Sequence, residues 1–208
     1  TRNVAVGAIA LDANSTASDN TAVGYQSLSA NTTGVDNVAL GSGTMNQSTT
    51  GSNNTGLGSG ALDANTTGSA NTAVGRMCLT TSSTASSNTA MGYYACGDLT
   101  TSANTTAIGN EACRNLTTGD HNTAVGDKAL YTSTDGGGNT CVGRLAGYLL
   151  TSAWGCTLIG NQAGDSITTG EDNTCIGHSN GINITTGHRN TLVGVSAGDV
   201  LTTGGNNI

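Results

Sequence analysis

The chain repeats one 17-residue unit along its length without an insertion or a deletion. The clearest copy spans residues 20–36 and reads NTAVGYQSLSANTTGVD. With Asn20 as position 1, position 5 is glycine in all twelve copies: Gly7, Gly24, Gly41, Gly58, Gly75, Gly92, Gly109, Gly126, Gly143, Gly160, Gly177 and Gly194. A fixed period of this length indicates stacked supersecondary units. Loops tolerate insertions, but stacked coils must share one circumference, so the strict period predicts a solenoid.

The composition excludes several other classes of protein. The net charge is −7 and only 9% of the 208 residues are charged, whereas a nucleic-acid-binding protein needs a basic face. No stretch approaches the ~20 apolar residues of a membrane-spanning helix. A low aromatic content is typical of disordered chains, but the apolar residues recur here at fixed positions. We therefore expect an ordered repeat protein that binds neither nucleic acid nor membrane through this segment.

The unit is too short for two helices and their turns, and its residues favour strands and corners. Thr, Val and Ile favour strands, while Gly and Asn favour turns. We predict strands at positions 2–4, 8–9 and 12–14, with corners of positive φ at the glycines of positions 5 and 15. The predicted fold is one all-β domain over residues 1–208, a parallel β-solenoid about 58 Å long at the usual strand spacing. Its twelve coils start at residues 3, 20, 37, 54, 71, 88, 105, 122, 139, 156, 173 and 190.

Alternation along the first strand divides its side chains between two faces. Position 4 is always a large apolar residue, so we predict that it points into the core together with position 2, which is Thr in ten copies. Position 3 then points outward, although it is small or apolar in every copy. We predict that this outward stripe is an oligomer interface, formed by Ala22, Ala39, Ala73, Ala90, Ala107, Ala124, Cys141, Leu158, Cys175 and Leu192.

A second apolar anchor changes position along the chain. Early copies carry a large residue at position 9, as at Leu28 and Leu62. The last four copies have Gly at position 9 and Leu or Ile at position 12, as at Gly164 and Ile167. We therefore predict two cross-sections, with a change of core pattern near residues 96–147.

The Asn and Thr columns can be explained by structural roles before any binding role is considered. Asn at position 1, present in ten copies, predicts a ladder of side-chain amides at a corner where the αL conformation is tolerated. Positions 13 and 14 are mostly Thr-Thr, so one of each pair should face inward and the other outward. The outer row is a candidate ice-, ligand- or glycan-binding face: Thr33, Thr50, Thr67, Thr101, Thr118, Thr169, Thr186 and Thr203. Ice-binding solenoids resemble it, although they carry Thr-x-Thr rather than a consecutive pair.

No residues form a catalytic or metal-binding motif. The three histidines occupy unrelated positions of the repeat, and the acidic residues lack the spacing of calcium-binding turns. We expect no enzyme activity, no metal and no cofactor. Cys96 and Cys113 share a column in adjacent coils, so they could form a disulfide or serve as small apolar core residues.

NTAVG at residues 20–24, 71–75 and 122–126 resembles the repeat motif of trimeric autotransporter adhesin heads, and the longer unit is similar to repeats in phage tail fibres. The adhesin heads are left-handed β-rolls of three chains. The resemblance therefore implies a left-handed homotrimer on a cell surface or virion, although the 17-residue coil is longer than the adhesin coil.

These observations together predict a segment of a longer, extracellular or virion fibre. It would act as a rigid spacer and a multivalent adhesive surface, with a host receptor or glycan as partner. Two alternatives remain open: an ice- or carbohydrate-binding solenoid that uses the Thr rows, and a filament that self-assembles through the unpaired strand edges at its ends.

Overall fold

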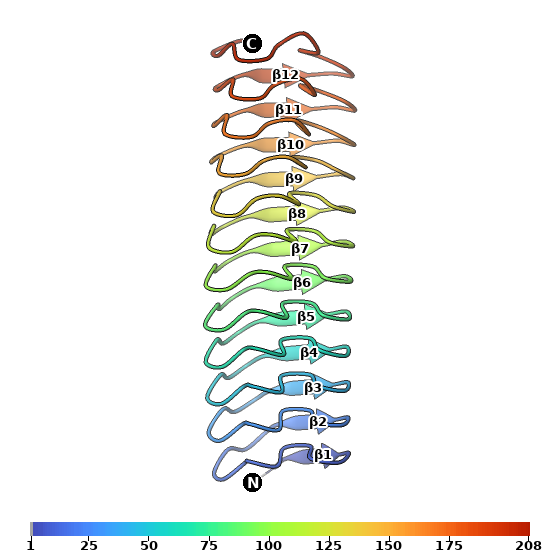
Figure 1. Ribbon diagram of the computed structural model, residues 1–208, viewed down its shortest axis with the longest axis vertical. Coiled ribbons are helices and arrows are strands. Elements are labelled where there is room, and N and C mark those ends of the chain that lie inside the picture. The colour runs from blue at the N-terminus through green and yellow to red at the C-terminus, as the bar shows by residue number, and fades with distance from the viewer. Residues whose placement is uncertain (1) are drawn as a thin grey trace.

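The computed structural model describes residues 2–208, which form a single column of stacked coils (Figure 1). Each coil contributes one three-residue strand, and the strands form one 12-stranded sheet in chain order. The strands are β1 (Val4–Val6), β2 (Thr21–Val23), β3 (Val38–Leu40), β4 (Thr55–Leu57), β5 (Thr72–Val74), β6 (Thr89–Met91), β7 (Thr106–Ile108), β8 (Thr123–Val125), β9 (Thr140–Val142), β10 (Thr157–Ile159), β11 (Thr174–Ile176) and β12 (Thr191–Val193). The predicted parallel β-solenoid is confirmed.

Every strand pairs in parallel with the next at a register of 17 residues, so that Ala22 lies opposite Ala39 and Val23 opposite Leu40. Like residues therefore form continuous columns along the rod. The two ends of the chain lie at opposite ends of the column (Figure 1).

The predicted strands at positions 8–9 and 12–14 do not form, because this part of each coil is a series of turns. Positions 7, 9 and 17 adopt positive φ, and most of them are not glycine: Gln26 has φ 53°, Leu28 has φ 51° and Asp36 has φ 58°. These left-handed residues cost energy outside glycine, but backbone hydrogen bonds hold them in place. The amide of Leu28, for example, donates to the carbonyl of Thr44 in the next coil at 2.9 Å.

Glycine at position 5 is required for two reasons. Gly109 has φ +141°, a conformation that L-residues rarely adopt, and a Cβ atom there would lie 2.3 Å from the carbonyl oxygen of Gly126. Gly34, at position 15, does not have the positive φ that we predicted. Its constraint is close approach alone, because a Cβ atom would lie 2.2 Å from the carbonyl oxygen of Gly51.

The Asn column forms the predicted amide ladder, and its members from Asn20 to Asn190 are fully buried. Asn37 donates through its backbone and side-chain amides to Oδ1 of Asn20, at 3.0 and 3.1 Å. Its side chain also donates to the carbonyl of Gly51 at 2.8 Å. Asn54 repeats the arrangement on Asn37. The residue in the αL conformation is the preceding one, at position 17, rather than the Asn itself.

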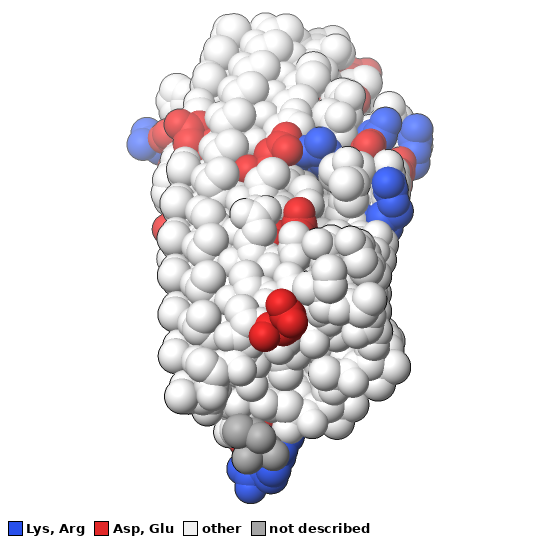
Figure 2. All heavy atoms as spheres, turned by 60° about the horizontal axis from the view of Figure 1, so that its bottom comes forward, with Lys and Arg blue, Asp and Glu red and all other residues white. Residues whose placement is uncertain are grey.

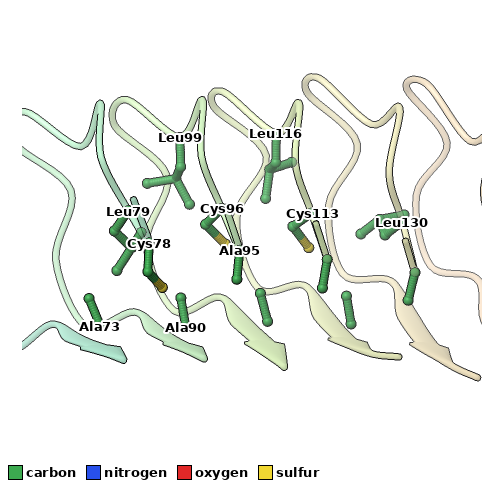
Figure 3. Packing of buried hydrophobic residues seen from close by; sticks show 14 of the residues in the cluster. Ala73, Cys78, Leu79, Ala90, Ala95, Cys96, Leu99, Cys113, Leu116 and Leu130 are labelled. Carbon is green, nitrogen blue, oxygen red and sulfur yellow. The ribbon is translucent and has the colours of Figure 1, made fainter. Parts of the chain in front are cut away.

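The core has the opposite phase from the one predicted for the strand. Position 3 points inward and meets the large side chain at position 9 or 12, so a small residue is required there. A Cβ atom on Gly56 would lie 2.7 Å from Cγ2 of Thr44 and 3.1 Å from Cε of Met45. Figure 3 shows the same relation in the middle coils, where the strand alanines lie below Leu79 and Leu130. Where Cys96 replaces leucine at position 9, Leu99 at position 12 points into the freed space.

In the last four coils the core is filled by the side chains of positions 3 and 12 instead of that of position 9. Leu158 and Ile167 are both fully buried. Gly164, at position 9, leaves the room that they need, because a Cβ atom there would lie 2.8 Å from Cδ2 of Leu158 and 2.8 Å from Cδ1 of Ile167. The change of core pattern along the chain is therefore an exchange of volume among three facing columns.

Candidate interaction surfaces

The residues predicted as an oligomer interface lie inside the coil, so that prediction is wrong. Ala22, Ala39, Ala73, Ala90, Ala107, Ala124, Cys141, Leu158 and Cys175 are fully buried within the single chain, and Leu192 packs against the same core. They are small or apolar because they face the side chains of positions 9 and 12. A partner chain cannot reach them.

The surface of the sheet is formed instead by positions 2 and 4, and we call these outward side chains of β1–β12 the strand face. Position 4 was predicted to be core, yet Leu40 is 48% and Met91 is 46% exposed. The column consists of Val6, Val23, Leu40, Leu57, Val74, Met91, Ile108, Val125, Val142, Ile159, Ile176 and Val193. Beside it runs the position 2 column, ten Thr and two Val. Within residues 2–208, none of these ten Thr hydroxyls has a hydrogen-bond partner.

The Thr pairs at positions 13 and 14 divide differently from the prediction. Thr49, at position 13, is half-buried, and its hydroxyl donates to the carbonyl of Thr66 in the next coil at 3.0 Å. Neither member of the pair faces the core. The predicted outer row is exposed, as expected: Thr33, Thr50, Thr67, Thr101, Thr118, Thr169, Thr186 and Thr203. Asp135 and Ser152 interrupt this column, so it is less regular than the strand face.

Tyrosines and cations form a ladder in the middle coils that the sequence analysis missed. The guanidinium of Arg114 lies 4.5 Å from the ring centroid of Tyr94, and Tyr131 stacks on Tyr148 at 5.3 Å. Lys128 lies 5.6 Å from the ring of Tyr131. The Arg114–Tyr94 and Tyr131–Tyr148 contacts join neighbouring coils, whereas Lys128 and Tyr131 belong to the same coil. Each contact is worth about 0.5–1.5 kcal/mol in general. The ring faces are taken by neighbours within the chain, so we assign the ladder to stabilisation of the coils.

A glycine makes room for this ladder. A Cβ atom on Gly97 would lie 2.9 Å from both Nη1 of Arg114 and Cδ1 of Tyr94. Asp98 forms an ion pair with Nη1 of Arg114 at 2.5 Å. The sequence signal was the shared column: Gly97, Arg114, Tyr131 and Tyr148 all occupy position 10.

Charged side chains are few and leave most of the surface neutral. In Figure 2 most of them lie in a band across the upper half of the view, with a few acidic groups below it and a basic group at the lower tip. Five basic side chains within residues 2–208 each pair with an acidic residue of the adjacent coil, as Arg144 does with Asp127 at 3.8 Å. Positions 2 and 4 carry no charged residue in any coil, so the strand face is uncharged along its whole length.

All six cysteines are free and buried, which settles the alternative between a disulfide and free thiols at Cys96 and Cys113 for this structure. Burial raises the pKa of Cys78 and of Cys175 to about 12 and that of Cys156 to about 11. The neighbouring Cys113 thiol and burial raise the pKa of Cys96 well above its usual value. A thiolate is the reactive form, so these side chains act as small apolar core residues at neutral pH.

The remaining polar cluster is a shallow hollow near the C-terminal end of the rod. It is lined by Thr169, Glu171, Asp172, Thr186, His188 and Arg189. Arg189 and Asp172 form an exposed ion pair at 3.7 Å, and nothing in the hollow pairs a nucleophile with a base. Across residues 2–208, no three His, Cys, Asp or Glu side chains converge as metal ligands. The same residues include no helix long and apolar enough to cross a bilayer.

No family model, curated protein or solved structure is significantly similar to this chain. The candidate surfaces therefore rest on geometry alone. They are the strand face, with its aliphatic and Thr columns, and the exposed Thr column of position 14.

Proposed function

We propose that the chain is a rigid structural segment of an extracellular or virion fibre, in which it acts as a spacer and a multivalent adhesive surface. The observation that carries this proposal is the unbroken stack, in which every strand from β1 to β12 pairs only with its neighbours in the chain. A column of this kind extends by about 4.8 Å per coil without a change in cross-section. Twelve coils give a rod of about 58 Å on the same basis.

Repetition supports an adhesive role as well as a mechanical one. A surface that recurs in every coil can hold several copies of a weak ligand at once, and linked weak contacts gain avidity without any new contact. We propose a host receptor or a glycan as the partner and the exposed Thr column, for example Thr50 and Thr67, as the contact surface. The resemblance to adhesin heads and tail fibres supports left-handed coiling, three chains and a location on a cell surface or virion.

Ice binding is a second candidate, and one observation favours it. The strand face places free Thr hydroxyls beside aliphatic side chains at a constant spacing, so it presents water with a regular, uncharged array. The position 14 column offers a second row of hydroxyls. A thermal-hysteresis assay tests this candidate, since a fibre spacer has no reason to retard the growth of ice crystals.

Small-angle scattering combined with electron microscopy tests the proposed function. We expect an elongated particle whose length is close to 58 Å for this chain and increases in proportion when whole 17-residue coils are added. A compact particle, or a length that does not follow the number of coils, would contradict the spacer role. Binding of glycans or host cells by an oligomer, but not by a variant with Lys at Thr50 and Thr67, would support the adhesive role.

A further inference from the structure

The strand face is an apolar strip that runs the full length of the rod. Its aliphatic column has one residue in each of the twelve strands, and several are strongly exposed: Val6, Leu40, Met91 and Val193 are 57%, 48%, 46% and 68% exposed. At ~4.8 Å per coil and ~3.3 Å per residue, twelve three-residue strands cover about 580 Å². About half of this area, roughly 290 Å², belongs to the aliphatic column and the rest to the Thr column. The aliphatic column alone is therefore close to the size of the largest apolar patch on a typical soluble monomer.

We propose that a second copy of this chain covers the strand face, with the two rods side by side along their length. This inference rests on the proposed fibre function and identifies the surface through which its chains associate. The residue before each strand from β2 to β12 is buried, but the glycine that follows each strand is at least partly exposed. With that glycine included, the strip covers about 760 Å² at the same spacings, close to the ~800 Å² per partner of a standard interface. The predicted interface at position 3 is excluded by its burial, so association must use another surface.

A second copy fits better than any other partner because of the spacing. A partner must match the rise of the coils over twelve strands, and a sheet with another rise would lose register within a few coils. Another copy has the same rise by construction. Neither column carries a charged residue, so two strand faces meet without like-charge repulsion.

The Thr column can be satisfied in the same arrangement. A buried hydroxyl without a partner costs free energy, and the ten position 2 hydroxyls have none within the described chain. A hydroxyl both donates and accepts, so the Thr column of one copy can pair with that of the next. Rotation about an axis parallel to the rods keeps every coil level with its equivalent and gives a closed assembly.

The test adds the same charges to two faces of the same two coils. Met91 and Ile108 lie on the strand face of coils six and seven, while Thr101 and Thr118 lie in the position 14 column of those coils. Mass from light scattering is measured against concentration for the wild type, for Met91→Lys with Ile108→Lys, and for Thr101→Lys with Thr118→Lys. We expect the wild type at a multiple of 20.4 kDa and the Thr variant at the same mass.

We expect the strand-face variant to be monomeric, with its dissociation constant raised on the order of 100-fold or more, because facing lysines would repel each other and lose water. Circular dichroism checks that it still folds. A milder pair, Met91→Thr with Ile108→Thr, places β-branched residues at both strand positions and should weaken association by about 10-fold, as expected for lost apolar burial.

Three results would overturn the inference. The first is a wild type that stays monomeric at all concentrations, and the second is a strand-face lysine variant that still associates. The third is dissociation caused by the Thr101 and Thr118 variant alone. A monomer whose thermal hysteresis is lost on substitution of Met91 and Ile108 would assign the face to ice instead. In each case a rod of the expected length leaves the spacer proposal intact, whereas a compact particle removes both.

Discussion

The exchange of core volume between Leu158 and Gly164 can be tested with a double-mutant cycle. Leu158→Ala removes a fully buried side chain, which costs about 2–5 kcal/mol. Gly164→Ala places a methyl group 2.8 Å from Cδ2 of Leu158 and 2.8 Å from Cδ1 of Ile167, at φ +56°. It should cost about 1 kcal/mol for the left-handed backbone and a further 1–3 kcal/mol for overpacking.

In the double variant the overpacking against Leu158 disappears, while the contact with Cδ1 of Ile167 remains. The two effects should therefore fall short of their sum by roughly half of the overpacking cost, about 0.5–1.5 kcal/mol. Gly43→Ala is the matched control, since Gly43 has φ +66° and no atom within 4 Å of the added methyl group. It should show only the backbone cost of about 1 kcal/mol.

The assay must report on single coils, because long repeat arrays do not always unfold in one step. Native-state hydrogen exchange measures the local opening free energy. Two backbone amides are useful probes. That of Thr157 donates to the carbonyl of Asn173 at 2.8 Å, and that of residue 164 donates to the carbonyl of Asn180 at 2.8 Å. Effects that add to within about 0.5 kcal/mol would refute the exchange of volume as the reason for glycine at position 9.

Three further predictions concern the turns, the thiols and the charges. Gly109→Ala should destabilise its coil far more than Gly194→Ala in hydrogen exchange, because both have strongly positive φ but only the first meets the next coil, at 2.3 Å; equal losses would show that the backbone conformation alone requires glycine. Cys78, buried with a pKa of about 12, should react with iodoacetamide at pH 8 only in denaturant, and fast labelling of the native protein would contradict its burial. Asp19 should titrate at about 2 rather than 3.8 because Arg2 hydrogen-bonds to it; its contribution to stability is then present above pH 3.8 and lost as the pH falls through 2, and Arg2→Ala should raise this pKa in an NMR titration.

The solenoid could be predicted from the sequence because the 17-residue period alone determines which residues of neighbouring coils lie opposite each other. The alternation of residues within a strand predicts two faces, but it does not say which one is inward. We assigned position 4 to the core because its residues are large. The interior is instead filled by side chains from the turns, such as Leu28 and Leu116, which leave room only for alanine at position 3. The phase therefore depends on side chains outside the strand.

The turns escaped prediction because leucine and glutamine rarely adopt positive φ. A signal was nevertheless present. Glycine replaces larger residues in some coils at all three left-handed positions, as at Gly43 in position 7, Gly147 in position 9 and Gly138 in position 17. A column that alternates between glycine and unrelated residues marks such a turn better than a column that is always glycine.

The surfaces could be predicted only in part. The structure confirms the exposure of Thr33 and its equivalents, although the strand alternation from which we predicted it is absent there. The strand face was not predicted, because positions 2 and 4 had been assigned to the core and position 3 to the surface. The ladder of Tyr94 and Arg114 was hidden because its members are scattered in sequence and meet only when the columns are aligned.

The two core patterns bear on how such a chain can evolve. When a whole unit is duplicated or deleted next to a similar one, the rod changes in length but the contacts between coils stay of the same kind. Gain or loss of a unit should therefore cost little stability. Transplanting a unit such as residues 156–172 among the early ones would set Leu158 against neighbours that already hold leucine at position 9. Growth should therefore occur within a block, and the graded coils between residues 96 and 147 should be the least tolerant of recombination.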